Sequence, residues 1–136
     1  MTWVKICGLS TKADVEVAQL AGADAIGFVL AEGSPRRVGE EQAAALVAHA
    51  DVPTYLVTRD LDPSDVVGVM ARTGASGLQP HGVHGREAAT VALEAGHHVL
   101  FPLVAGGTIA WESLPDGARA IVDGPDPGTG MAVAWK

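Results

Sequence analysis

The sequence has little of several residue types, and each shortage excludes a class of protein. Cys7 is the single cysteine, which excludes an internal disulfide and any cysteine-rich zinc site. No apolar run approaches the length of a membrane span, although hydrophobic residues make up 48% of the chain. The 9 lysines and arginines against 16 aspartates and glutamates give a net charge of −7, which argues against a nucleic-acid surface. Because Met1 leads directly into an apolar segment without a secretory leader, we expect a soluble cytoplasmic protein.

Short apolar runs alternate with amphipathic segments along the whole chain, and this order predicts βαβ units on a parallel sheet. The expected strands cover residues 3–7, 25–30, 54–58, 77–79, 98–103 and 118–122. The expected helices cover residues 12–21, 40–50, 62–73 and 85–95, with a poor helix near 108–114. We therefore expect a single α/β domain over residues 1–136, which is long enough to bury a core.

The number of these units indicates how much of a barrel they form. A complete eight-unit (β/α) barrel at the small end of its size range has about 200 residues, or about 25 per unit. At that rate 136 residues hold between five and six units. We expect a TIM-barrel-type domain with parallel strands, incomplete and truncated after about six of eight strands. Its first and sixth strands then present open edges, so self-association or a complementing fragment is expected.

The first strand carries the clearest chemical pattern. Apolar and polar residues alternate from Val4 to Cys7, so the side chains of Lys5 and Cys7 share a face. Gly8 frees the backbone to turn, which leaves Cys7 at the carboxyl end of the strand, where parallel α/β proteins place their chemistry. Most free cysteines are buried small hydrophobes. Since a neighbouring ammonium favours the thiolate form, Cys7 is also a candidate base.

Three blocks of sequence together resemble one enzyme family. They are residues 5–8 (KICG), 22–28 (GADAIGF) and 34–36 (SPR). Their order and spacing are similar to phosphoribosylanthranilate isomerase of tryptophan biosynthesis, and the resemblance runs through the whole chain. It implies an isomerase that performs the Amadori rearrangement of N-(5-phosphoribosyl)anthranilate. It also implies that no metal and no organic cofactor takes part.

The resemblance assigns catalytic roles to residues at two strand ends. In the family, the cysteine that matches Cys7 is the general base, and the aspartate that matches Asp123 is the general acid. An acid at the ring oxygen and a base at C2 suit ring opening and the proton shift that follows. Most aspartates at strand ends only cap or turn the chain, and Asp123 before Gly124 fits that interpretation as well.

The same resemblance assigns substrate-binding roles to the loop after the second strand and to the end of the fourth strand. Arg36 matches the arginine that binds the anthranilate carboxylate, and a guanidinium fork fits a carboxylate with two hydrogen bonds. The alternative is a solvated loop charge. Gln79 and His81 match a Gln-x-His-Gly pattern, although His81 could equally be a surface histidine. Pro80 between them removes a hydrogen-bond donor from the strand and predicts a local distortion.

The remaining substrate-binding candidates are Lys5, beside Cys7, and Gly128 and Gly130, which match part of a Gly-rich loop after the sixth strand. The family binds the substrate phosphate with loops after strands 7 and 8, for which we find no sequence here. This leaves two alternatives to the isomerase: a truncated, non-catalytic relative that acts as a binding or assembly module, and an enzyme for a smaller sugar phosphate. The expected ligand is a small phosphorylated molecule, with no nucleic acid or membrane as partner.

Overall fold

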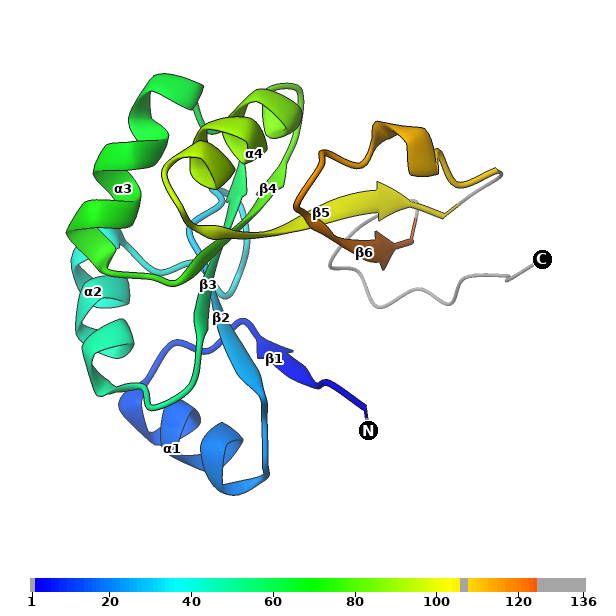
Figure 1. Cartoon of the computed structure of the whole chain (residues 1–136). Coiled ribbons are helices and arrows are strands. Elements are labelled where there is room, and N and C mark those ends of the chain that lie inside the picture. The colour runs from blue at the N-terminus through cyan, green and yellow to red at the C-terminus, as the bar shows by residue number, and fades with distance from the viewer. Residues whose placement is uncertain (1, 106–107, 125–136) are drawn as a thin grey trace.

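The computed structural model of the chain describes residues 2–105 and 108–124 (Figure 1). Its six strands are parallel and lie in one sheet in the order of the chain. They are β1 (Lys5–Cys7), β2 (Ala25–Val29), β3 (Thr54–Arg59), β4 (Gly77–His81), β5 (His98–Val104) and β6 (Arg119–Asp123). The predicted barrel-type α/β fold with parallel strands is confirmed.

Four helices cover the outer face of the curved sheet (Figure 1). They are α1 (Lys12–Leu20), α2 (Glu40–His49), α3 (Val66–Thr73) and α4 (Gly85–Glu94). The 3₁₀ turn η1 (Pro63–Asp65) leads into α3, and the 3₁₀ turn η2 (Trp111–Ser113) stands where the poor helix was predicted. In the part of the chain that the structure describes, no helix is both long and apolar enough to cross a membrane.

The main core lies between this outer face and the helices. Because strand side chains alternate, one set of residues on β2, β3 and β4 points toward the helices and the other lines the inner face. Ile26, Phe28, Leu56 and Leu78 belong to the outer set, and each is fully buried. α1 begins in a capping box, in which the Thr11 hydroxyl accepts a hydrogen bond from the Asp14 amide at 3.1 Å.

The sheet is weakly joined between β4 and β5. These two strands pair only at Gly77 with His98 and at Leu78 with Val99, whereas β3 and β4 pair along the whole of β4. In parallel strands the backbone groups of successive residues point alternately to the two neighbours. The carbonyl of His81 accepts from the amide of Asp60 on the β3 side, so Pro80 faces β5.

A second proline faces the same weak junction between β4 and β5, which forms a seam in the sheet. The amide of Ala105 donates to the carbonyl of Asp123 on β6, so Pro102, three residues earlier, faces β4. Neither Pro80 nor Pro102 has an N–H, so each strand lacks a donor where the pairing stops. This is the physical form of the distortion predicted at Pro80, although Pro80 itself is buried and paired in register with Thr58.

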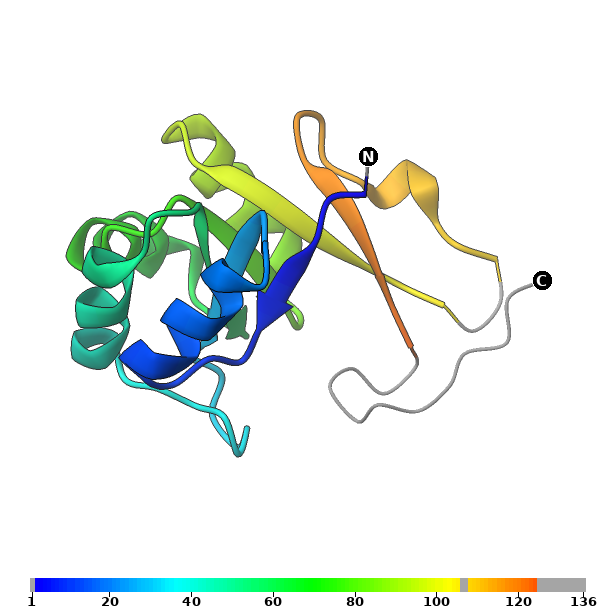
Figure 2. The same ribbon diagram turned by 90° about the horizontal axis from the view of Figure 1, so that it is seen from below.

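The sheet curves without closing. Within the described residues β1 pairs only with β2, and β6 pairs only with β5. The two edge strands nevertheless approach each other on the inner side (Figure 2). At the amino-terminal end the Arg119 guanidinium lies 5.5 Å from the centre of the Trp3 ring. Trp3 also meets Tyr55 edge to face, with ring centres 6.4 Å apart.

Candidate active site

The polar residues at the carboxyl ends of the strands surround one hollow of about 560 Å³ on the inner face. The residues predicted from sequence that line it are Lys5, Cys7, Arg36, Gln79, His81 and Asp123. They come from β1, from the loop after β2, from β4 and from β6, so the curvature of the sheet brings both of its edges to one space. Gly128 and Gly130 lie outside the described residues.

Cys7 is accommodated by a glycine on the neighbouring strand. Cys7 and Gly27 are register partners on β1 and β2. A Cβ atom at position 27 would lie 2.9 Å from the Cys7 sulfur and 3.1 Å from Lys5 Cε. The absence of a side chain on β2 therefore leaves room for the thiol, which is half-buried. This function of Gly27 was not predicted, because it depends on the pairing register.

Arg36 lies across the end of the first strand. A Cβ atom at Gly8, whose φ is +82°, would lie 2.7 Å from Arg36 Cδ, so this glycine provides both the turn and the space for the arginine. The Ser34 hydroxyl accepts a hydrogen bond from the Arg36 amide at 3.2 Å and shapes the loop. Among the described residues, the Arg36 guanidinium has no hydrogen-bond partner, so its planar fork is available to an anion.

A line of side-chain contacts crosses the hollow from β1 to β6. Lys5 Nζ donates to Gln79 Oε1 at 2.9 Å, and Gln79 Nε2 lies 3.3 Å from His81 Nε2. His81 Nε2 in turn lies 3.9 Å from Asp123 Oδ2. Burial lowers the pKa of His81, and its charged neighbours Arg59 and Lys5 lower it further, whereas Asp123 acts in the opposite direction.

Arg59 also lines the hollow and was missed by the sequence analysis. The predicted third strand ended at residue 58, whereas β3 continues to Arg59. Arg59 has the same parity as Val57 and therefore faces the same side. Extending the predicted strand by one residue would have placed this cation in the site.

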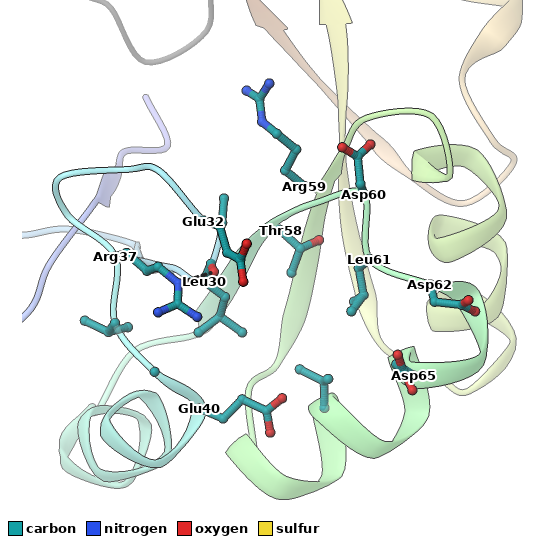
Figure 3. A pocket seen from close by; sticks show the side chains of 14 residues that line it. Leu30, Glu32, Arg37, Glu40, Thr58, Arg59, Asp60, Leu61, Asp62 and Asp65 are labelled. Carbon is teal, nitrogen blue, oxygen red and sulfur yellow. Dashed lines mark hydrogen bonds between the residues drawn. The ribbon is translucent and has the colours of Figure 1, made fainter.

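A second hollow, of about 620 Å³, lies beside the first, between the loops that follow β2 and β3 (Figure 3). Glu32, Thr58 and Arg59 border both hollows. Most of its other charged groups have partners, such as Glu40 with Arg72 at 2.8 Å. Although it is larger, it does not contain the thiol or the strand-end carboxylate, so the chemistry is assigned to the smaller hollow.

The turn after β3 has an unusual backbone. Asp60 has a φ of 55°, the left-handed region that aspartate and asparagine tolerate better than most residues. Its carboxylate accepts a hydrogen bond from the Val83 amide at 2.9 Å, which ties the loop after β3 to the loop after β4. This hydrogen bond therefore holds together the two loops that border the site next to His81.

The described residues contain no group of three or more histidine, cysteine, aspartate or glutamate side chains that could hold a metal ion. The potential reacting groups that line the hollow are a thiol, two carboxyl groups, an imidazole and three cations. Such a set is suited to moving protons on an anionic substrate. The fold and the site together define a (β/α)-barrel-type domain with an acid–base site at the carboxyl ends of its strands.

Comparisons with known proteins identify the family. The family model of N-(5'-phosphoribosyl)anthranilate isomerase matches residues 4–136. The isomerase of Rubrobacter xylanophilus is 34% identical over 145 positions, which cover 100% of this chain and 70% of that protein. The isomerase of Pelobacter propionicus is 42% identical over 89 residues, covering 65% of this chain and 42% of that protein.

A solved structure agrees with the sequence relatives. The crystal structure of the isomerase from Thermus thermophilus matches with a TM-score of 0.84 and 31% identity, covering 98% of this chain and 68% of that one. The matched segments thus span between 42% and 70% of these three relatives' lengths. The chain belongs to the N-(5'-phosphoribosyl)anthranilate isomerase family, which confirms the resemblance seen in the sequence.

Proposed function

We propose that the protein catalyses the Amadori rearrangement of N-(5-phosphoribosyl)anthranilate in tryptophan biosynthesis. The observation that carries this proposal is that Cys7 from one edge of the sheet and Asp123 from the other line a single hollow together with Arg36. Family membership supports the same reaction. The rearrangement only moves protons within the substrate, so a thiol as base and a carboxyl group as acid are the types of group that it requires.

Asp123 is the proposed general acid. In its protonated form it gives its proton to the ring oxygen of the sugar while the nitrogen lone pair forms the C1=N bond, and the ring opens to a protonated imine (iminium). Cys7, as thiolate, then removes the proton from C2, and the electrons of that C–H bond form the enolamine that rearranges to the ketone. The side chain of Asp123 is 25% exposed, so it reaches the hollow while remaining partly shielded from water.

Arg36 is the proposed anchor for the anthranilate carboxylate. Arg36 lines the hollow and occupies the space left by the missing side chain of Gly8, and a bidentate pair with a carboxylate would orient the aromatic end of the substrate. Lys5, Gln79 and His81 are the polar groups nearest the sugar in this arrangement. Gly128 and Gly130 remain proposed contacts of the substrate.

We further infer that residues 1–136 act as one domain, since one sheet carries the whole described site. We also infer that the protein acts in the cytoplasm. Within the described residues the outer edges of β1 and β6 have no strand partner, and we infer that they pair with a second copy or with a complementing segment, because an unpaired apolar strand edge is a ready template for another strand.

The test is steady-state kinetics of the 136-residue chain and three variants. Cys7→Ser and Asp123→Asn should each lower kcat by roughly two to four orders of magnitude, the usual effect of a positioned proton-transfer group. Arg36→Met should raise KM more than it lowers kcat, because its role is binding. Asp116→Asn, an exposed aspartate just before β6, is the matched control and should leave kcat unchanged. Unchanged turnover in Cys7→Ser, or no turnover by the parent chain, would contradict the proposal.

A further inference from the structure

We propose that Lys5, acting through Gln79, holds His81 as the neutral imidazole with its proton on Nδ1, so that Nε2 has no proton to donate to Asp123. Lys5 and Gln79 are then positioning residues, and they act on the proposed acid through His81. The proposal follows from three contacts that share one direction, from β1 through β4 to β6.

The first contact fixes the amide of Gln79. A lysine ammonium has donors and no acceptor, so the Gln79 atom 2.9 Å from Lys5 Nζ has to be the oxygen. The amide nitrogen, which is a donor only, is therefore directed at His81. Gln79 is 5% exposed, and turning the amide over would bring two donors together in a buried place. The orientation of Gln79 is thus set by the charge on Lys5.

The second contact fixes the proton of His81. The Gln79 amide nitrogen lies 3.3 Å from His81 Nε2, and a hydrogen bond between two nitrogens needs one of them to be an acceptor. Since the amide nitrogen cannot accept, Nε2 must present its lone pair. A neutral imidazole carries one proton, so that proton is on Nδ1.

The charged and titratable groups around the ring support its neutral form. Lys5 on β1 and Arg59 on β3 are the cations that face His81, Asp123 on β6 is the anion, and Cys7 lines the same hollow. Burial has the largest effect on the ring and opposes its protonation, and both cations act in the same direction. Only Asp123 favours the imidazolium, and the net effect is a lowered pKa of His81.

The third contact gives the arrangement its function. Asp123 Oδ2 lies 3.9 Å from the same Nε2 atom, which is beyond hydrogen-bond distance. Because Nε2 carries no proton and its lone pair already accepts from Gln79, it has nothing to donate to the Asp123 carboxyl group. Asp123 is therefore not drawn into an ion pair with His81, and its carboxyl group is left to face the ring oxygen of the substrate. This last step rests on the proposed function, whereas the tautomer of His81 does not.

The test is two-bond ¹H–¹⁵N correlation spectroscopy of the full chain labelled with ¹⁵N-histidine at neutral pH, which reports the tautomer of each ring. His81 should show the pattern of a neutral ring protonated on Nδ1. Gln79→Leu should move His81 to the Nε2-protonated tautomer or to a mixture, and Lys5→Met should do the same if Gln79→Leu does not fold. Gln42→Leu, which removes an exposed amide that donates to the Ser10 carbonyl, is the matched control.

Asp123→Asn separates this proposal from its simplest rival. If Lys5 and Gln79 set the tautomer, His81 should keep its proton on Nδ1 when the carboxylate is removed. A switch of tautomer in Asp123→Asn, or an Nε2-protonated or doubly protonated His81 in the parent chain, would overturn the proposal. Loss of isomerase activity with the Nδ1 tautomer intact would instead count against the proposed function alone.

Kinetics provide the second measurement. Gln79→Leu should lower kcat by about tenfold, which is less than the loss of the acid itself, and should change KM by less than about twofold. If Gln79 were only a substrate contact, KM would rise while kcat was retained. That result would contradict the positioning role.

Discussion

The two sides of the β4–β5 seam are built differently. On one side, β2 and β3 are almost wholly buried under the helices, and β4 is buried as far as Pro80. On the other side, β6 has no fully buried residue, and η2 is the single helical turn between β5 and β6 in the described part of the chain. Figure 2 shows β5 and β6 extending away from the helical layer. The candidate site uses both sides, since Cys7 and Gln79 belong to the first and Asp123 to the second.

This difference in burial indicates which side chains of the site are held rigidly. The amide and the imidazole are held by β4, which is buried on its outer face, so their positions are fixed by the main core. The thiol is held by the half-buried edge strand β1, whose Ile6 packs against the same core. Asp123 is held by its pairing with β5 and by few apolar contacts. Because Pro80 and Pro102 leave the seam without two donors, we expect β5 and β6 to move more easily relative to β4 than β3 does.

The largest expected difference is between the losses of unfolding free energy when one apolar side chain on each side of the seam is shortened to alanine. Leu78 on β4 is fully buried, whereas Ile121 on β6 is half-buried against a small cluster of Ala25, Tyr55 and Leu100. Leu78→Ala should lower the free energy of unfolding by about 2–5 kcal/mol, the usual cost of a cavity in a packed core. Ile121→Ala should lower it by about 1 kcal/mol, because partly exposed side chains lose less.

Urea denaturation, followed by circular dichroism, measures both values, with the m-value as a check that the transition stays two-state. Equal losses for the two variants would show that β6 is as firmly packed as β4, and would remove the basis of the comparison.

A smaller loss of unfolding free energy is expected when side-chain hydrogen bonds of α1 and η2 are removed. Thr11 caps α1 on the covered side, and Thr11→Ala should lower the free energy of unfolding by about 1 kcal/mol. The hydroxyl of Ser113 in η2 donates to the Ala110 carbonyl at 2.7 Å, and Ser113→Ala should change stability by less than about 0.5 kcal/mol. Thermal unfolding of both variants under one condition is sufficient to rank them. A larger loss in Ser113→Ala would mean that η2 supports the fold more than a helix cap does.

Much of the fold and part of the site were predictable from the sequence, because both depend on local patterns. The two-residue period of a strand placed Lys5 and Cys7 on one face, and the same period applies to Gln79 and His81. Strand ends were less certain, and this explains the missed Arg59. Asp123 was found because a carboxylate follows an apolar run at the expected place.

The features that could not be predicted depend on register and on pairs of distant strands. The contact between Lys5 and Gln79 joins β1 to β4 and depends on the stagger of the two strands between them. The space that Gly27 leaves for Cys7 depends on one register as well. The seam requires two prolines on different strands to face each other. Which neighbouring strand each proline faces is known only once the pairing of the strands is known.

The last expected effect is a change in pH dependence, and it tests His81, which ends β4 and lies 3.9 Å from Asp123 on β6. Its pKa is lowered from 6.5, chiefly by burial, so between pH 6.5 and its folded value the unfolded chain binds a proton that the folded chain does not. Stability from this group is therefore complete above pH 6.5 and is lost as the pH falls below it. The parent chain should lose more unfolding free energy than His81→Gln between pH 7.5 and pH 5.5, by less than about 1 kcal/mol. His84→Gln, at an exposed histidine, is the control and should follow the parent. Parallel pH profiles for the parent and His81→Gln would show that this ring titrates freely, as it would if β6 did not shield it.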